Sequence, residues 1–280
     1  MVFQEPLLFK TSVFHNVAYG LRLRRFNKKV VKKRVDEMLK RVKLLDFSKR
    51  KASKLSGGEA QRIAFARALV VEPEIVLLDE PFGSLDPLTK KDLKTELKQL
   101  LREMNVTGVY VTHDQAEALE MADRIAVIED GRIRQIGTPD QIFYHPADEF
   151  IAKFVGVDTV VPGIVTRQEE GLAEIEVEGL LFQAVSDAQV GCKVTVCIRP
   201  EDVTIILPVD GEKASARNHF NATIVKIKNL GAVSKITLDC GFKLIAAITK
   251  RSLEDLGLKE SRQVLASIKA TAVHVIEQPR

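Results

Sequence analysis

The stretch Ile75-Val-Leu-Leu-Asp-Glu-Pro81 places four apolar residues directly before two carboxylates. A short, β-branched apolar run predicts a buried strand of a parallel sheet, and open α/β sheets bind ligands at the carboxyl ends of their strands. Because neighbouring strand residues point to opposite faces, one of the two acids can hold Mg²⁺ through its bound waters while the other orients the water that attacks phosphorus. Alone, the acidic pair would be explained better by a helix cap or a solvated loop.

A second apolar run, Val109–Thr112, delivers His113 and Asp114. An amphipathic stretch from Leu88 to Met104 lies between the two runs, as a helix does between parallel strands. We therefore expect His113 at the edge that holds the acids, where a neutral imidazole can hydrogen-bond a terminal phosphate. A lone histidine there is more often structural, so its neighbours decide the interpretation.

The following residues are expected to complete this sheet. Arg124–Ile128 predicts a third strand, and Glu129-Asp-Gly131 before Arg132 is a hairpin signal that adds an antiparallel edge. We expect the α/β unit to cover residues 1–155.

A glycine turn stands upstream, where Ser56-Gly-Gly-Glu59 runs into the helix-forming Ile63–Val70. Ser56 is expected to cap this helix. Two glycines at a helix start let backbone N–H groups approach a phosphate, which the helix dipole also favours. An ordinary glycine-rich turn would explain the pattern if it stood alone.

Together these residues resemble the nucleotide-binding domain of ABC transporters, a P-loop NTPase fold, over residues 1–154. Five motifs stand in the order of that family, which makes a chance match implausible. They are Val2-Phe-Gln4 (Q-loop), Leu55–Glu59 (signature), Leu77–Pro81 (Walker B), Gly83-Ser-Leu-Asp86 (D-loop) and Thr112-His-Asp114 (switch).

The resemblance implies a role for each matched residue. Asp79 and Gln4 bind Mg²⁺ or its waters, Glu80 is the general base, and His113 contacts the γ-phosphate of ATP. Gln4 also belongs to the catalytic set. The remaining nucleotide contacts, made to the ATP that the opposite subunit holds, are assigned to Ser56, Gly57, Gly58, Glu59 and Asp86.

The chain departs from the family in one respect. No glycine is followed by lysine, so the phosphate loop G-x-x-x-x-G-K-[ST] is absent, together with the aromatic residue that stacks on adenine. We expect Met1 to be an internal methionine of a longer protein, the alternative being a decayed or regulatory subunit. The 280 residues alone are expected to be inactive as an ATPase. Glu59 stands where glutamine is commonest, a change that we expect to be tolerated.

The second half changes character, with short Val-, Ile- and Thr-rich runs broken by glycines. It predicts an all-β, OB-like barrel domain over residues 156–280, in two related modules at about 157–208 and 213–276. Pro208–Lys213 is the expected connector. The expected strands are Gly163–Thr166, Ala173–Val177, Lys193–Ile198, Ala222–Ile227, Lys235–Leu238 and Leu244–Ile248.

This half resembles the regulatory TOBE domain of importer ATPases at Cys197–Asp202, and a molybdate- or tungstate-binding Mop-like module over Ser215–Ile276. A tetrahedral oxyanion needs N–H and hydroxyl donors with a nearby cation. The candidate donors are Ser215, Ala216, Thr249 and Lys269, and these residues would equally serve to build a barrel.

The composition excludes several classes of protein. The net charge of +4 gives little reason to expect nucleic acid as a partner. Three cysteines lack metal-ligand spacing and are too few for a disulfide framework, which suggests a reduced cytosolic protein. Fifteen Lys or Arg lie between Arg22 and Lys54, either as a solvated helical face or as a surface near anionic lipid.

The sequence therefore predicts the ATPase subunit of an importer for molybdate, tungstate or a related oxyanion, with ATP and Mg²⁺ as cofactors. It would form a homodimer on two permease subunits at the cytoplasmic face of the membrane, served indirectly by an extracytoplasmic binding protein. The alternatives are a non-catalytic oxyanion sensor or storage protein, and an inactive truncated subunit. A soluble ABC ATPase acting on nucleic acid or ribosomes is disfavoured, because long coiled-coil heptads and a duplicated ATPase cassette are absent.

Overall fold

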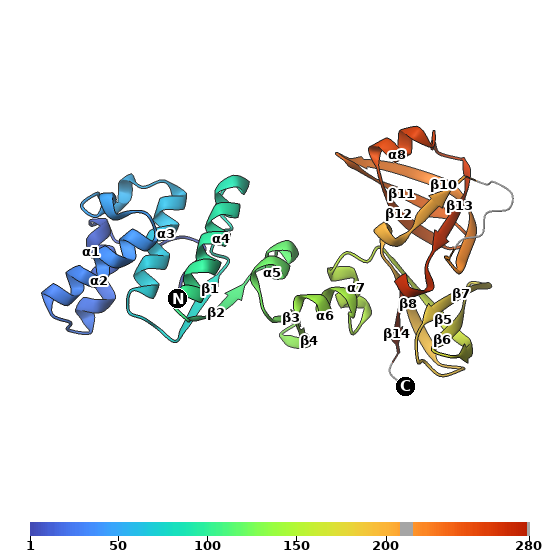
Figure 1. Ribbon diagram of the computed structural model, residues 1–280, viewed down its shortest axis with the longest axis horizontal. Helices are drawn as coiled ribbons and strands as arrows, with labels where there is room; N and C mark the ends of the chain where they lie inside the picture. The colour runs from blue at the N-terminus through green and yellow to red at the C-terminus, as the bar shows by residue number, and fades with distance from the viewer. Residues whose placement is uncertain (208–214, 279–280) are drawn as a thin grey trace. The chain divides into compact units, whose positions relative to one another are not determined.

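The computed structural model describes residues 1–207 and 215–278, which form two compact units, Met1–Ala122 and Asp123–Arg280 (Figure 1). The division lies earlier than the expected boundary after residue 155. The reason is that the segment ahead of that boundary is tied to the β-rich half by Arg199. The Arg199 guanidinium donates to the carbonyls of Val155, at 3.1 Å, and Phe143, and lies 3.6 Å above the Phe143 ring.

The first unit combines helices with a small parallel sheet. Its elements are α1 (Val13–Leu23), α2 (Lys28–Arg41), η1 (Leu45–Phe47), η2 (Ala52–Lys54), α3 (Gly57–Leu69), β1 (Ile75–Asp79), α4 (Pro87–Glu103), β2 (Thr107–Val111) and α5 (Gln115–Met121). The predicted strands and the long helix between them are confirmed. Strands β1 and β2 run parallel, with Asp79 opposite Val111.

Val2 extends this sheet on the other side of β1. Its N–H donates to the Leu77 carbonyl at 2.8 Å, and its carbonyl accepts from the Asp79 N–H at 2.9 Å. The backbone pairing thus brings the residues after Val2 to the carboxyl end of β1.

The two faces of the sheet differ. Val76 and Leu78 are buried among the side chains of α3 and α4, whereas Ile75, Leu77 and Val109 are 45–58% exposed. Period-2 alternation sends successive residues to opposite faces, so one face forms the core and the other is open in this unit.

The second unit begins with a hairpin and two short helices, followed by barrel strands. Its elements are β3 (Ile125–Glu129), β4 (Arg132–Gly137), α6 (Pro139–Tyr144), α7 (Glu149–Phe154), β5 (Thr159–Glu169), β6 (Leu172–Val177), β7 (Leu180–Val185), β8 (Lys193–Ile198), η3 (Pro200–Asp202), β9 (Thr204–Ile206), β10 (Asn218–Leu230), β11 (Val233–Asp239), β12 (Lys243–Thr249), α8 (Lys250–Asp255), β13 (Gln263–Ile268), η4 (Ala270–Ala272) and β14 (Val273–Glu277). The predicted hairpin is confirmed as β3 and β4. The expectation that its first strand joins the parallel sheet is wrong for the described residues, where β3 pairs with β4 alone.

The two predicted β-modules are present but exchange their last strands. One sheet has the order β14-β8-β5-β6-β7 and the other the order β12-β11-β10-β13-β9. Strand β9 is the last strand of the first module in sequence but pairs with β13, and β14 is the last strand of the second module but pairs with β8. The predicted connector, Pro208–Lys213, lies outside the described residues.

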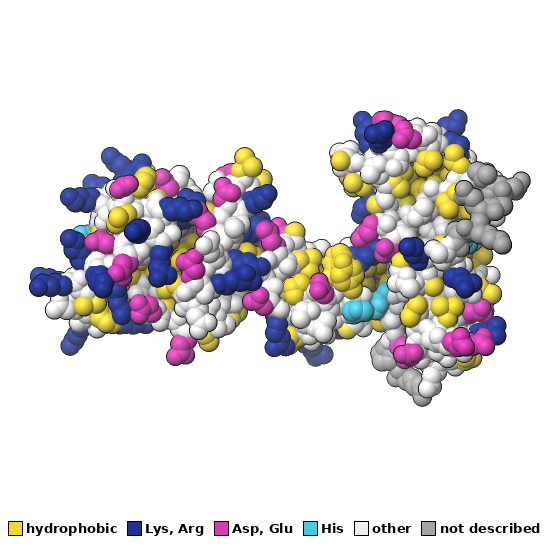
Figure 2. Space-filling view, viewed as in Figure 1, with side chains coloured by type: hydrophobic (Ala, Val, Ile, Leu, Met, Phe, Trp, Pro, Cys, Tyr) yellow, Lys and Arg dark blue, Asp and Glu magenta, His cyan; other side chains and the backbone are white. Residues whose placement is uncertain are grey.

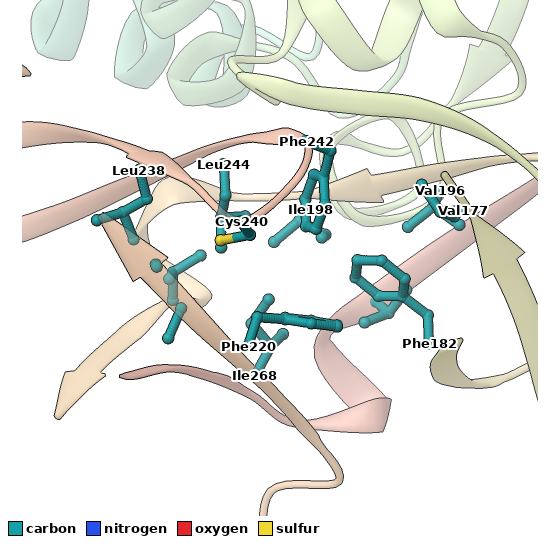
Figure 3. Close-up of a cluster of buried hydrophobic side chains, with 14 of the residues drawn as sticks. Val177, Phe182, Val196, Ile198, Phe220, Leu238, Cys240, Phe242, Leu244 and Ile268 are labelled. Carbon is teal, nitrogen blue, oxygen red and sulfur yellow. The ribbon is translucent and has the colours of Figure 1, made fainter. Parts of the chain in front are cut away.

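A shared apolar core explains why the modules form one unit (Figure 3). Phe182 of the first module packs against Phe220 and Phe242 of the second, with ring centroids 4.5 and 5.3 Å apart.

Burial raises the pKa of the Cys197 and Cys240 thiols to about 12, which makes these thiols unreactive. Within the described ranges, each helix is too short or too polar to cross a bilayer.

Candidate functional site

The sheet edge after β1 holds Glu80 in a fixed backbone position. Its N–H donates to the Val111 carbonyl at 3.0 Å, which ties the residue to the end of β2. Glu80 has a φ of 42°, in the left-handed region that residues other than glycine adopt at a cost. The neighbouring Phe82, only 1% exposed, anchors the turn in the core.

His113 meets Glu80 at this edge. The imidazole Nδ1–H donates to Glu80 Oε1 at 2.8 Å, and this hydrogen bond raises the pKa of His113. The His113 side chain is 79% exposed and that of Glu80 is 30% exposed, so both groups are accessible from solvent. The structure therefore brings together a carboxylate and an imidazole from two adjacent parallel strands.

Asp79 directly precedes Glu80, and Gln4 lies against the turn that follows Glu80. Asp79 ends β1, next to Glu80, and is held by the hydrogen bond of its N–H to Val2. The Gln4 amide packs on Gly83, since a Cβ built there would lie 2.7 Å from Gln4 Nε2. Glycine at position 83 thus permits the Q-loop amide to approach the turn that follows the acids.

The signature segment forms a capped helix start, which confirms the cap predicted from the sequence. Ser56 Oγ accepts from the Glu59 N–H at 3.4 Å, and Glu59 Oε2 accepts from the Ser56 N–H at 2.7 Å. This reciprocal pair is a capping box. The bond from the Ser56 backbone lowers the pKa of Glu59, so the glutamate that replaces glutamine here has a structural partner.

Gly58 is required for the approach of α3 to α4. A Cβ at this position would lie 2.7 Å from Thr89 Cγ2, whereas one at Gly57 would lie 3.4 Å from Leu85 Cδ2. Asp86 caps α4 by accepting from the Thr89 N–H at 3.1 Å. The signature and the D-loop are therefore packed side by side.

These two segments line one open depression of about 490 Å³. Its walls include Ser56–Glu59, Ser84–Asp86, Arg62 and Thr89. Glu80 and His113 are not among its lining residues. The predicted residues thus fall into two groups: the carboxylate–imidazole edge and the glycine depression.

A polar network beside His113 was missed at the level of sequence. Glu117 is 4% exposed and accepts hydrogen bonds from Tyr110 and Thr112, the latter at 2.9 Å, and forms an ion pair with Lys90. The available signal was Asp114 followed three residues later by Glu117, a spacing typical of a helix start.

The candidate oxyanion residues do not all meet within the chain. Asn218, the first residue of β10, pairs with Ile268 of β13, so Lys269 lies near the beginning of β10. Ser215 and Ala216 lie there too, because they precede Asn218 by two or three residues. Thr249 pairs with Val233, which is opposite Leu230 at the far end of β10. Thr249 caps α8 there by accepting from the Ser252 N–H at 3.0 Å.

The basic segment, Arg22–Lys54, runs from the end of α1 through α2, η1 and η2, and its Lys and Arg side chains are interspersed with acidic ones (Figure 2). Arg34 Nη2 lies 3.2 Å from Glu72 Oε2, and Lys43 Nζ lies 3.0 Å from Glu96 Oε1. These pairs are what a solvated helical face presents.

Comparison with known families agrees with this architecture. Residues 1–83 match the family model of the ABC transporter, and residues 214–275 match that of the TOBE domain. The fold and these two matches define an ABC-type ATP-binding protein with a C-terminal β-domain.

Named relatives make the family more specific. The chain is 40% identical to a molybdate/tungstate import ATP-binding protein of Pyrococcus horikoshii, over 94% of this chain and 74% of that protein. It is 38% identical to a sulfate/thiosulfate import ATP-binding protein of Thermosynechococcus vestitus, over 94% of this chain and 72% of that protein. It is 42% identical to a spermidine/putrescine import ATP-binding protein of Acetivibrio thermocellus, over 75% of this chain and 59% of that protein. The chain belongs to the family of ABC import ATP-binding subunits, which are ATPases.

Proposed function

We propose that this chain is the ATPase subunit of an ABC importer for an oxyanion, molybdate or tungstate above all. The support is that the two relatives cited above that match 94% of the chain are named for oxyanions. The match to the spermidine/putrescine relative covers 75%. Polyamine import is therefore the competing substrate class, and the binding experiment below includes it.

The observation that carries the hydrolytic role is the 2.8 Å contact between Glu80 and His113 at the ends of two parallel strands. In this proposal Glu80 accepts a proton from an attacking water, and His113 donates a hydrogen bond to a terminal phosphate. The hydrogen bond from the Glu80 N–H to the Val111 carbonyl joins the two strand ends that carry Glu80 and His113. This backbone contact exists in the folded chain without bound substrate.

Mg²⁺ fits the donor set at this edge. Asp79 offers a carboxylate and Gln4 an amide oxygen, which are the hard oxygen ligands that Mg²⁺ prefers. Residues 1–207 and 215–278 contain no cluster of three or more His, Cys, Asp or Glu suited to a metal, so the remaining ligands would be water and phosphate oxygens. Bound there, Mg²⁺ would neutralise phosphate charge, and Asp79 and Gln4 would hold it beside Glu80.

The separation of the two groups of residues supports a composite site between two subunits. Ser56 and the two glycines line a depression that lacks Glu80 and His113. A helix N-terminus of this kind binds anionic groups through its free N–H donors. In the proposed homodimer, the signature of one subunit therefore faces the nucleotide served by Glu80 of the other.

The remaining partners follow from the importer role. The dimer would dock on two transmembrane permease subunits at the cytoplasmic face of the membrane, and an extracytoplasmic binding protein would deliver the anion to them. The C-terminal barrels would bind the oxyanion through Ser215, Ala216 and Lys269. Thr249 would join these residues only in a site built from more than one copy, since it lies at the other end of β10.

Hydrolysis is tested in a chimaera that places the phosphate loop of an ABC importer ATPase ahead of Met1. Glu80→Gln should lower the rate of ATP hydrolysis by roughly 10²–10⁴-fold, with nucleotide binding retained. The matched control is Glu74→Gln, which removes an exposed carboxylate just ahead of β1. An unchanged rate in the Glu80 variant would refute the assignment of the general base.

Substrate class is tested by titrating the chain with molybdate, tungstate, sulfate and spermidine in a calorimeter. The proposal predicts binding of molybdate or tungstate, reduced by Lys269→Met and unaffected by Lys259→Met, a change at another exposed lysine. Binding of spermidine alone would contradict the oxyanion assignment. Molybdate binding without ATP turnover, even beside an intact partner subunit, would favour the sensor or storage protein instead.

A further inference from the structure

The segment that carries His113 is attached to α4 by a row of lysines. Lys90, Lys94 and Lys98 are one helical turn apart, so they lie on the same face of α4. Lys90 contacts Glu117 and Asp114, Lys94 contacts Glu120, and Lys98 Nζ donates to the Glu120 carbonyl at 2.5 Å. The row therefore joins α4 to α5 along the whole length of α5.

Lys90 differs from the other two lysines because it holds the residues that flank His113. Its Nζ lies 3.2 Å from Asp114 Oδ2 and also pairs with Glu117 Oε1. Thr112 Oγ1 donates to Glu117 Oε2 at 2.9 Å and accepts from the Asp114 N–H at 3.0 Å. Both neighbours of His113 are thus fixed by one network centred on Glu117.

The network surrounds Glu117, a buried and ionised carboxylate, so it constrains the geometry of the groups that bind it. Burial alone would raise the pKa of Glu117, but hydrogen bonds from Lys90, Tyr110 and Thr112 outweigh burial and lower it. The hydrogen bond to Glu117 likewise raises the pKa of Lys90. Separating Lys90 from Glu117 would leave the buried Glu117 charge uncompensated, so the ion pair between the two side chains is maintained.

The position of Lys90 gives the network a further consequence. It stands in the first turn of α4, four residues after Asp86, which caps this helix from the D-loop. A displacement of the D-loop would therefore move α4 and, through Lys90, the residues on both sides of His113.

We propose that Glu117 and Lys90 are positioning residues for His113, which couple the D-loop end of α4 to the imidazole that meets Glu80. The inference rests on the role that the proposed function gives to His113. The coupling itself is a property of the folded chain and is measured without ATP.

The test is the titration of His113 by NMR in the 280-residue chain, whose five histidines keep the spectrum simple. A His113→Gln variant assigns the resonance. In the parent chain the pKa of His113 is raised by Glu80, so it reports directly whether the two side chains stay together.

The sign of the shift separates positioning from simple electrostatics. Lys90→Met removes a cation, which by charge alone would raise the pKa of His113 further. If Lys90 positions His113, the contact with Glu80 loosens and the pKa falls toward the ordinary value of about 6.5. Lys98→Met is the matched control, since Lys98 binds only the far end of α5, and it should leave the titration unchanged.

Two further variants keep the test decisive. Lys90→Arg retains a charged donor and should restore the raised pKa, whereas Tyr110→Phe removes one neutral donor to Glu117 and should lower the pKa by a smaller amount. Circular dichroism verifies that each variant is folded. If Lys90→Met folds, an unchanged or higher pKa of His113 would overturn the proposal. If Lys90→Met does not fold, an unchanged pKa of His113 in folded Tyr110→Phe would overturn it. Neither result depends on whether His113 acts on ATP.

Discussion

The sheet edge and the glycine turn of the first unit are held in place by different forces. Glu80 is positioned by backbone pairing over a buried face that includes Leu78, 2% exposed, and Phe82, 1% exposed. The signature turn is exposed and depends on the capping box of Ser56 and on the missing side chain of Gly58. The edge should therefore respond most to cavities beneath it, and the turn to single polar or steric changes.

The largest expected effect comes from a cavity under the edge. Leu78→Ala removes a buried side chain from β1 and should lower the free energy of unfolding by about 2–5 kcal/mol. Leu77→Ala, on the exposed face of the same strand, should cost less than about 1 kcal/mol. Urea denaturation of both variants measures the difference. Equal losses would show that both faces of β1 are buried in solution.

The two adjacent glycines of the turn give the next largest contrast. Gly58→Val brings a side chain into collision with Thr89 and should cost about 1–3 kcal/mol. Gly57→Ala has room beside Leu85 and should change stability by less than about 1 kcal/mol, in the stabilising direction. Thermal unfolding distinguishes the two. A loss at Gly57 as large as that at Gly58 would mean that flexibility, and not close packing, requires these glycines.

Loss of the cap should have a smaller effect. Ser56→Ala removes the side-chain acceptor for the Glu59 N–H and should destabilise the chain by about 0.5–2 kcal/mol. Ser53→Ala, at an exposed position in η2, serves as the control with no expected change. If both serines gave the same result, the capping box would not contribute to stability.

The smallest effect is expected from pH. Contact with Glu80 raises the pKa of His113, so its contribution to stability is complete below the ordinary value of about 6.5. That contribution is lost as the pH rises through the higher pKa of the folded chain. Glu80→Gln should remove this part of the pH dependence when melting temperatures are compared across that range. Identical pH profiles would show that the contact is not maintained in solution.

Local patterns in the sequence predicted much of the first unit. Apolar runs ending in polar residues predicted β1 and β2, and their parallel pairing brings Glu80 to His113 as expected. The cap at Ser56 followed from residue type and spacing. These features depend on neighbours in sequence or on a simple strand register, which is why pattern analysis reaches them.

Features that depend on long-range partners were not predictable in this way. Strands β9 and β14 were not among the predicted strands, and no local pattern shows which sheet each of them joins, so the exchange was missed. Sequence analysis identified Arg199 only as part of the Cys197–Asp202 motif. Its hydrogen bonds to the carbonyls of Val155 and Phe143 attach the segment before residue 156 to the second unit, so the boundary between the units lies earlier than predicted. Lys90 and Glu117 are 27 positions apart, and only the packing of α4 against α5 brings them together.

The most direct test of the composite site is subunit mixing in the phosphate-loop chimaera. Glu80→Gln and Ser56→Arg chains should each be inactive alone, because every site in either homodimer lacks one group. In a mixed dimer, the intact Glu80 of one subunit meets the intact signature of the other. An equal mixture should then recover about a quarter of the parent ATPase rate, since random twofold pairing leaves one working site in half of the dimers. No recovery above the separate variants would contradict the account, because it would mean that Glu80 and Ser56 serve the same nucleotide from the same chain.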